Sequence, residues 1–107
     1  MKKILDEINL PYAYNHFSEG ESPNPPFICY LFPKSDNFSA DGSVYLSKSE
    51  VVLELYTDSK DLKLENKIEK VLIKNNIFFE KSEVYIAVEK LYEVIYYFTI
   101  NMEEYYG

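Results

Sequence analysis

The sequence contains no arginine, no tryptophan and no glutamine, so all eleven of its basic residues are lysines. Without arginine, the protein has no bidentate guanidinium group with which to read guanine or to clamp a phosphate. Eighteen acidic residues bring the net charge to −7, and an acidic surface repels a polyanion. We therefore expect no nucleic-acid partner.

Cysteine and histidine are represented by one residue each, Cys29 and His16. A single cysteine excludes an internal disulfide and a cysteine-based zinc site, and its apolar surroundings predict a buried, inert thiol. His16 has no Ser, Cys or carboxylate at a recognised catalytic spacing, so we expect a structural histidine near the end of a strand. These absences predict no catalytic residue, no cofactor and no metal ligand, and hence no enzyme.

Glycine is also scarce, and long apolar runs are missing. The three glycines, Gly20, Gly42 and Gly107, are too scattered for a phosphate-binding loop. The N-terminal stretch MKKILDEINL is interrupted by Asp6 and Glu7, which argues against a signal peptide and a membrane span. We expect no membrane partner and a location in the cytoplasm of the cell that makes the protein.

Aromatic residues are plentiful, with eleven Tyr and seven Phe in a chain of 107 residues that is 47% hydrophobic. A chain of this length forms one domain, and this composition is sufficient for a packed core. We therefore treat residues 1–107 as a single domain. The tyrosines near the C-terminus are compatible both with strand propensity and packing and with a protein–protein surface.

Apolar periodicity predicts two helices. Residues 2–9 place Ile4, Leu5 and Ile8 on one face. Residues 60–75 form the second helix, capped by Asp58-Ser59 and ended by Asn75-Asn76 with one Asn in the left-handed region. Its inward face comprises Leu64, Ile68, Val71, Leu72 and Asn75, and its mostly outward residues are Lys63, Glu65, Lys67, Glu69, Lys70 and Lys74.

Strands are predicted at 12–17, 27–32, 44–57, 83–88 and 92–100, the last two forming a hairpin with a tight connection at 89–91. Alternation directs Val51, Leu53 and Leu55 to one side, and likewise Val94, Tyr96, Phe98 and Ile100. The run 27–32 does not alternate, as in a strand that is central or covered on both faces. Residues 33–43 are expected to form a loop. The long strand 44–57 is expected to bend near 47–49, with its first half standing out as a hairpin arm.

The predicted fold is therefore α+β, a largely antiparallel sheet with a helix packed on one face, in the order α-β-β-β-α-β-β. Four of the five prolines lie on either side of the strand 27–32. They either simply end the strand, or they stiffen its loops so that less entropy is lost when the loops dock on a neighbour.

Two long stretches carry a family resemblance: LPYAYNHFSEGESPNPPFICYLFPKSDNFSADGSVYLSKSEVVLELYTDSKD and, after the second helix, FFEKSEVYIAVEKLYEVIYYFTI. The motifs are PxPPFI, NFSADGxVY, ELYTDxKD and EKLYEVxY, and together they span roughly residues 10 to 100. In these motifs the chain resembles small proteins from the morphogenesis modules of phages and prophages of low-GC bacteria, in particular the tail completion or tail terminator group of long-tailed phages.

The resemblance implies an α+β subunit without catalytic residues that assembles into a ring, typically hexameric, on the end of the tail tube. The subunit would stop tube polymerisation and join the tail to the head. Its partners would be other copies of itself, the tail tube protein and the head-completion protein. It would lie in the host cytoplasm during assembly and then in the tail or neck of the virion.

Several other functions stay open. Head–tail connector proteins and minor tail proteins have similar lengths and folds. A small acidic adaptor or antitoxin-like module would bind a basic partner, and an enzyme would need a carboxylate site without a known motif. For a ring former, the arm 37–49 is the predicted contact, because it carries apolar groups that a polar loop does not need. We assign its interface residues as Phe38, Asp41 and Tyr45.

Overall fold

The computed structural model describes residues 1–18, 20–33, 35–40 and 43–101. For residues 35–40, 43–47 and 101 it describes the backbone alone. The elements are α1 (Lys2–Ile8), β1 (Tyr12–Tyr14), β2 (Phe27–Leu31), β3 (Ser35–Ala40), β4 (Ser43–Thr57), α2 (Leu62–Lys74), β5 (Phe79–Ile86) and β6 (Leu91–Asn101). The sheet has the order β1-β2-β4-β6-β5, and β3 pairs with β4 outside this path. Over the described ranges every strand pair is antiparallel except β1–β2, which confirms the predicted α+β class with a largely antiparallel sheet.

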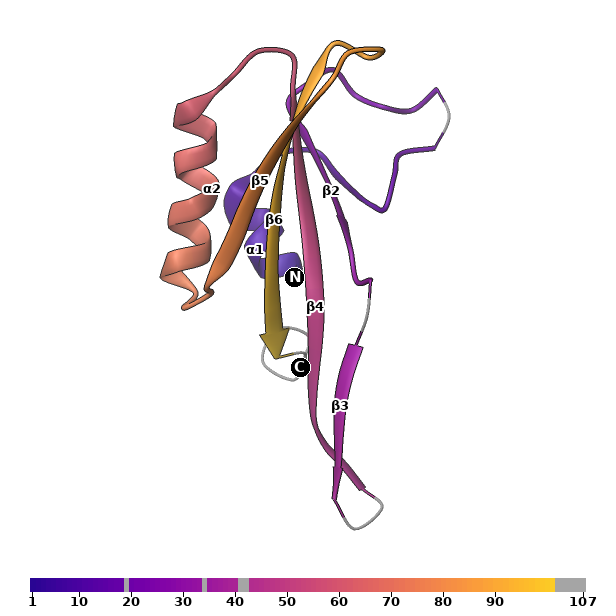
Figure 1. Ribbon diagram of the computed structural model, residues 1–107, viewed down its shortest axis with the longest axis vertical. Coiled ribbons are helices and arrows are strands. Elements are labelled where there is room, and N and C mark those ends of the chain that lie inside the picture. Colours follow the sequence, from indigo (N-terminus) through magenta and orange to yellow (C-terminus); the bar gives the residue numbers. More distant parts are fainter. Residues whose placement is uncertain (19, 34, 41–42, 102–107) are drawn as a thin grey trace.

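Both helices lie against one face of the sheet (Figure 1). In α2, Ile68 and Leu72 are completely buried, as the apolar periodicity predicts, while Leu64 is half-buried against the core. The helix begins later than predicted: its N-cap is Asp61, whose Oδ1 accepts a hydrogen bond from the Leu64 backbone N–H at 3.0 Å. Its end agrees with the prediction, since Asn76 has a left-handed φ of 59°.

The core lies between these helices and the covered face of the sheet. Every residue that the alternation of β4 and β6 directs inward is buried, and so is the apolar side of α1. These residues are Ile4, Leu5, Ile8, Val51, Leu53, Leu55, Val94, Tyr96, Phe98 and Ile100. Burying one large apolar side chain contributes about 1.5–3 kcal/mol, so this layer dominates the stability of the domain.

The opposite side of the sheet, here called the open face, carries no helix (Figure 1). The strand registers place on it Phe27, Cys29 and Leu31 of β2, Glu50, Val52, Glu54 and Tyr56 of β4, Glu93, Ile95, Tyr97 and Thr99 of β6, and Glu80, Ser82 and Val84 of β5. Residues 15–18 and 20–26, here called the segment 15–26 for its described parts, cover one end of this face, where the rings of Phe17 and Phe27 lie 5.3 Å apart. Phe27, Ile28 and Cys29 are consecutive buried residues because this end of β2 is covered on both sides, as predicted.

The predicted loop 33–43 is wrong in part, because residues 35–40 form strand β3. The polar sequence SDNFSA has little strand propensity, and it is held extended by pairing with the first half of β4, from Ser35↔Ser49 to Ala40↔Ser43. The hairpin arm is therefore confirmed, but the irregularity lies between Phe38 and Ser39 and not at 47–49.

Other strand limits also differ from the prediction. The first strand comprises only Tyr12–Tyr14, because Asn15 takes a left-handed φ of 66°. Strand β5 begins at Phe79, four residues before the predicted position 83, and ends at Ile86. Its second to fourth residues, Glu80, Lys81 and Ser82, are polar, and pairing with β6 keeps them in the sheet. The connection is the turn 87–90, in which Lys90 has a positive φ of 57°.

Candidate functional site on the open face of the sheet

Two of the three predicted interface residues, Phe38 and Tyr45, fall on the arm, defined from here on as β3 together with residues 43–47 of β4. The backbone of Phe38 pairs with Leu46, next to Tyr45 on the same ribbon, and Asp41 lies outside the described residues. The β4–β6 register runs only as far as Lys48↔Asn101, so the arm continues past the rest of the sheet (Figure 1). The structure thus brings the backbones of Phe38 and Tyr45 together, and their role in an interface stays a prediction.

The two residues singled out for their chemistry lie apart from the arm. His16 is exposed just beyond β1, and within the described chain its side chain has neither a hydrogen bond nor an ion pair. Cys29 is 4% exposed, which confirms the predicted burial of the thiol. Burial, followed by the nearby carboxylates of Glu54 and Glu93, raises the pKa of the Cys29 thiol to about 11. The thiol is therefore protonated and unreactive at neutral pH.

An acidic pair, Glu54 and Glu93, lies on the open face beside its covered end, since Glu93 shares a cross-strand row with Tyr56 and Phe27. Glu54 is the cross-strand neighbour of Cys29, and Glu93 is that of Tyr56, whose hydroxyl donates a 2.9 Å hydrogen bond to Glu93 Oε2. Burial, the hydrogen bond with Glu93 and repulsion from its charge together raise the pKa of Glu54 to about 7. Near neutral pH the Glu54 carboxyl group is therefore protonated in about half of the molecules.

This acidic pair has no cationic partner among the residues that the structure describes. Along β4 the next lysine on the open face is Lys48, six residues from Glu54 and hence about 20 Å away at 3.3 Å per residue. Desolvated carboxylates without a cation are costly to the fold, and such groups concentrate at functional sites. Sequence reasoning did not identify the pair, because Glu54 and Glu93 are far apart in the chain.

A second pair of carboxylates, Glu65 and Glu69 of α2, lies on the covered face. Glu65 is only 2% exposed, so its predicted outward position is wrong. The sequence spacing already indicates that Glu65 is buried. Glu65 precedes Ile68 by three residues and Leu72 by seven, so it lies on the same face of the helix. Its neighbours are Lys60, with Nζ 2.6 Å from Glu65 Oε2, and Lys81, with Nζ 2.8 Å from Glu65 Oε1.

This second pair belongs to what we call the buried network, comprising Lys60, Glu65, Glu69, Lys81 and Tyr96. The Tyr96 hydroxyl and the Lys81 ammonium each donate a 2.8 Å hydrogen bond to Glu69 Oε2. Burial opposes the charge of Glu65, but the hydrogen bonds from Lys60 and Lys81 outweigh it and hold the pKa of Glu65 below its usual value. The network fastens α2 to β5 and β6, which is a structural role.

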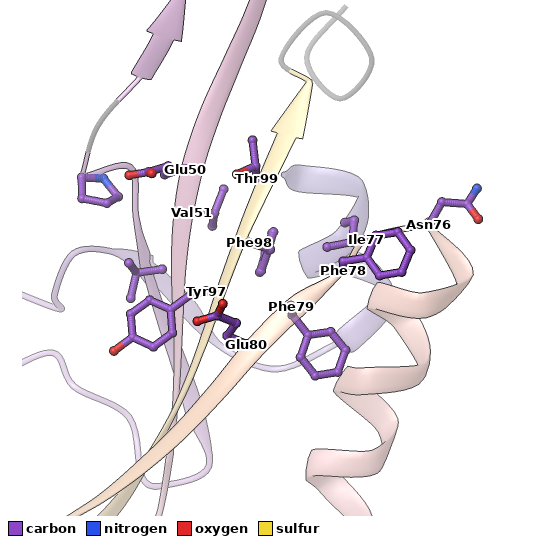
Figure 2. A pocket seen from close by; sticks show the side chains of 12 residues that line it. Glu50, Val51, Asn76, Ile77, Phe78, Phe79, Glu80, Tyr97, Phe98 and Thr99 are labelled. Carbon is purple, nitrogen blue, oxygen red and sulfur yellow. The ribbon is translucent and has the colours of Figure 1, made fainter.

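A cavity of about 800 Å³ lies near the start of β5. Its lining includes both Val51 and Val52 and both Tyr97 and Phe98, and neighbouring residues of a strand face opposite sides. Figure 2 accordingly shows Glu50 and Tyr97 on one side of the strands and Ile77, Phe78 and Phe79 towards α2. The cavity therefore wraps round the end of β5. Within the described ranges no group of His, Cys, Asp and Glu is arranged to hold a metal ion.

The outer side of α2 carries what we call the lysine row: Lys63, Lys67, Lys70 and Lys74. The four residues recur at intervals of four, three and four, so they follow one side of the helix. They line a shallow hollow of about 380 Å³ together with Glu7 of α1. Lys74 pairs with Glu7 at 3.1 Å, whereas the other three lysines have no ion pair to any described residue.

Comparison with known proteins does not extend these findings. No protein-family model matches the chain, and no curated protein is significantly similar to it. None of the helices in the described part of the chain has the length and apolar character needed to cross a membrane. The family resemblance of the sequence motifs thus stays a prediction, to be weighed with the arm and the open face.

Proposed function

We propose that the protein is a structural subunit of phage or prophage morphogenesis, a tail completion or tail terminator protein. A homo-oligomeric ring of such subunits caps the tail tube and joins it to the head. The sequence motifs of residues 10–100 suggest this role, and the α+β fold is compatible with it. The tail tube protein and the head-completion protein are then its partners, in the host cytoplasm first and later in the virion.

The observation that carries the proposal is the arm. Residues 43–47 of β4 pair with β3 beyond the last described β4–β6 pair, so among the described residues the sheet has two strands in this part. An isolated two-stranded ribbon is marginally stable in water, and its edges offer unpaired N–H and C=O groups. An arm of this kind is typical of a subunit that is completed by contact with a neighbour.

Replacing residues 37–43 by a short Gly-Ser linker tests this role. We expect the core to fold normally, because the buried core residues named above lie in α1, in β2, in α2, in β6 and in β4 from Val51 onward, and we expect ring formation or tail completion to be abolished. Folding is measured by circular dichroism, and assembly is measured by light scattering and by electron microscopy of tails. As a control, Val88→Ser changes the other hairpin at a residue that is 95% exposed, and it should leave assembly intact.

The outcomes separate the candidate functions. Rings and infectious particles formed by the shortened variant would overturn the role of the arm. Tails of normal length made without the protein would overturn terminator function. A stable complex with a basic protein and no self-assembly would instead support the acidic adaptor or antitoxin-like module.

A further inference from the structure

The open face of the sheet is an apolar surface with acidic groups and no covering helix. Val52, Leu31 and Ile95 are half-buried there, and Tyr97 is 43% exposed. The carboxylates of Glu50, Glu54, Glu80 and Glu93 lie among them on three neighbouring strands. A sheet face of this composition is suited to a partner that supplies both apolar side chains and positive charge.

The same chain presents a matching surface on its opposite side. The lysine row runs along the outside of α2, which lies on the side of the sheet away from the segment 15–26 (Figure 1). Three of its four lysines form no ion pair within the described chain, in a protein whose net charge is −7. The positive charge is thus concentrated on one side of the molecule, and the uncompensated acidic pair lies on the other.

We propose that the open face of one copy receives the outer side of α2 of a second copy, with the lysine row placed over Glu54 and Glu93. The contact specifies which two surfaces of neighbouring subunits meet in the ring, so this inference rests on the proposed function. The two surfaces lie on opposite sides of the subunit and cannot both be used in one two-fold dimer. The contact is consequently heterologous and generates a ring or an open chain.

The dimensions of the two surfaces agree. The thirteen residues of α2 give a helix of about 20 Å at 1.5 Å per residue. The part of β4 from Glu50 to Tyr56 has about the same length at 3.3 Å per residue. Four strands spaced about 4.8 Å apart offer a width of about 14 Å, enough for one helix of roughly 10 Å diameter.

The size of the contact also predicts its strength. One helix laid on the sheet covers much less than the roughly 800 Å² per partner that is usual for a stable interface. A single contact should therefore be weak and sensitive to salt, and ring closure or the arm should add to it.

A charge-exchange experiment with the full chain tests the contact. The face variant carries Glu54→Lys with Glu93→Lys, and the helix variant carries Lys67→Glu with Lys70→Glu. Each variant alone places like charges across the contact, so we expect its self-association, measured by sedimentation and light scattering, to weaken at least tenfold. A mixture of the two variants restores opposite charges at every contact, so it should recover assemblies of alternating composition.

The proposal fails if neither variant alters self-association, if the mixture does not recover it, or if the unaltered protein is monomeric at every soluble concentration. The helix variant changes only exposed residues, so it remains informative even if the face variant does not fold. A face variant that loses only tail tube binding would show that the tube, and not a second copy, occupies the face. Failure of tail completion with normal charge-dependent self-association would overturn the proposed function and leave the contact standing.

Cross-linking gives a second test that does not depend on affinity. In a Cys29→Ala background, Lys67→Cys and Ile95→Cys variants are mixed and treated with a short thiol cross-linker. We expect a covalent dimer that contains one of each variant. Pairing Lys67→Cys with Val88→Cys, at the exposed hairpin turn, is the control and should give little product. Equal yields from the two pairings would contradict the contact.

Discussion

Two pairs of glutamates on opposite faces of one sheet have different surroundings. On the covered face, Glu65 and Glu69 contact the ammonium groups of Lys60 and Lys81 and the hydroxyl of Tyr96. On the open face, Glu54 and Glu93 contact each other and Tyr56, without a cation among the described residues.

The two surroundings shift the pKa values of Glu65 and Glu54 in opposite directions. Two lysines hold the pKa of Glu65 below its usual value although the side chain is buried. Burial and a like charge raise the pKa of Glu54 to about 7. The first arrangement stabilises the subunit by itself, and the second is stabilised only when a positive charge arrives from outside. The comparison thus separates a group that serves the fold from a group that is available for a partner.

The largest expected effect concerns the apolar layer beneath the buried network. Ile68→Asp places an unpaired charge in the core and should cost about 4 kcal/mol or more, enough to unfold a domain of ordinary stability. Circular dichroism and thermal melting measure the loss. Ile73→Asp, on the exposed side of the same helix, is the matched control and should remain folded. A soluble Ile68→Asp variant as stable as the parent would show that α2 does not cover the sheet.

Removing a cation from the buried network should have the next largest effect. Lys81→Met leaves Glu65 with Lys60 alone and should cost about 1–2 kcal/mol, less than in a fully buried pair because Lys81 is partly exposed. Urea denaturation at neutral pH measures it, and Lys63→Met on the outer side of α2 is the control.

The loss caused by Lys81→Met should also depend on pH. The pKa of Glu65 is lowered in the folded state, so its ion pairs stabilise the fold above the unfolded pKa, and this contribution is lost as the pH falls through the folded value. The two proteins should therefore converge in acid. A difference that is unchanged in acid would contradict the assignment to Glu65.

Neutralising the acidic pair should act in the opposite direction. The pKa of Glu54 is raised to about 7 in the fold, so the folded state holds this proton more tightly, and stability is lost as the pH rises from about 4.5 to 7. Glu54→Gln avoids this loss and should stabilise the isolated subunit at pH 8 by about 1 kcal/mol, a value reduced for partial exposure.

The same substitution should weaken self-association, because it removes a charge that faces the lysine row. Denaturation from pH 5 to pH 8 and light scattering on the same samples measure both effects, with Glu89→Gln in the exposed turn 87–90 as the control. The charged and titratable groups around Glu54 are Cys29 on β2, Tyr56 on β4 and Glu93 on β6, while the nearby positions on β5 are Ser82 and Val84. A variant that is destabilised at pH 8 would contradict the raised pKa of Glu54.

The smallest effects are expected at the two residues that sequence reasoning excluded from catalysis. His16→Gln should leave folding and assembly unchanged, and Cys29→Ala should cost about 1 kcal/mol through lost packing. A thiol reagent should modify Cys29 slowly in the folded protein and rapidly in urea, since burial raises the pKa of the thiol to about 11. Complete loss of function in a well-folded His16→Gln protein would revive an enzymatic role.

Much of the fold follows from local pattern. Helix α2 and the inward sides of β4 and β6 were predicted because amphipathic periodicity reports which side of an element is buried. The position of Glu65 was missed because its charge was given more weight than its spacing. Strand β3 was missed because its polar sequence forms a strand only when paired with β4.

The candidate site was less accessible to prediction. The arm was expected from the length of the segment 44–57, which exceeds that of an ordinary strand. The acidic pair was not expected, because Glu54 and Glu93 are ordinary polar positions in two alternating strands 39 residues apart. Only the pairing of Tyr56 with Glu93 brings the two carboxyl groups together.

The sequence by itself determined the class of fold, the two amphipathic helices and the inward side of the central strands. These features depend on composition and on periods of two or 3.6 residues, which are local properties of the chain. Tertiary structure alone decided which charges are neighbours. Strand register and helix packing join Glu65 to Lys81 and Glu54 to Glu93, and the energy of a buried charge depends on that neighbour and on the water it loses.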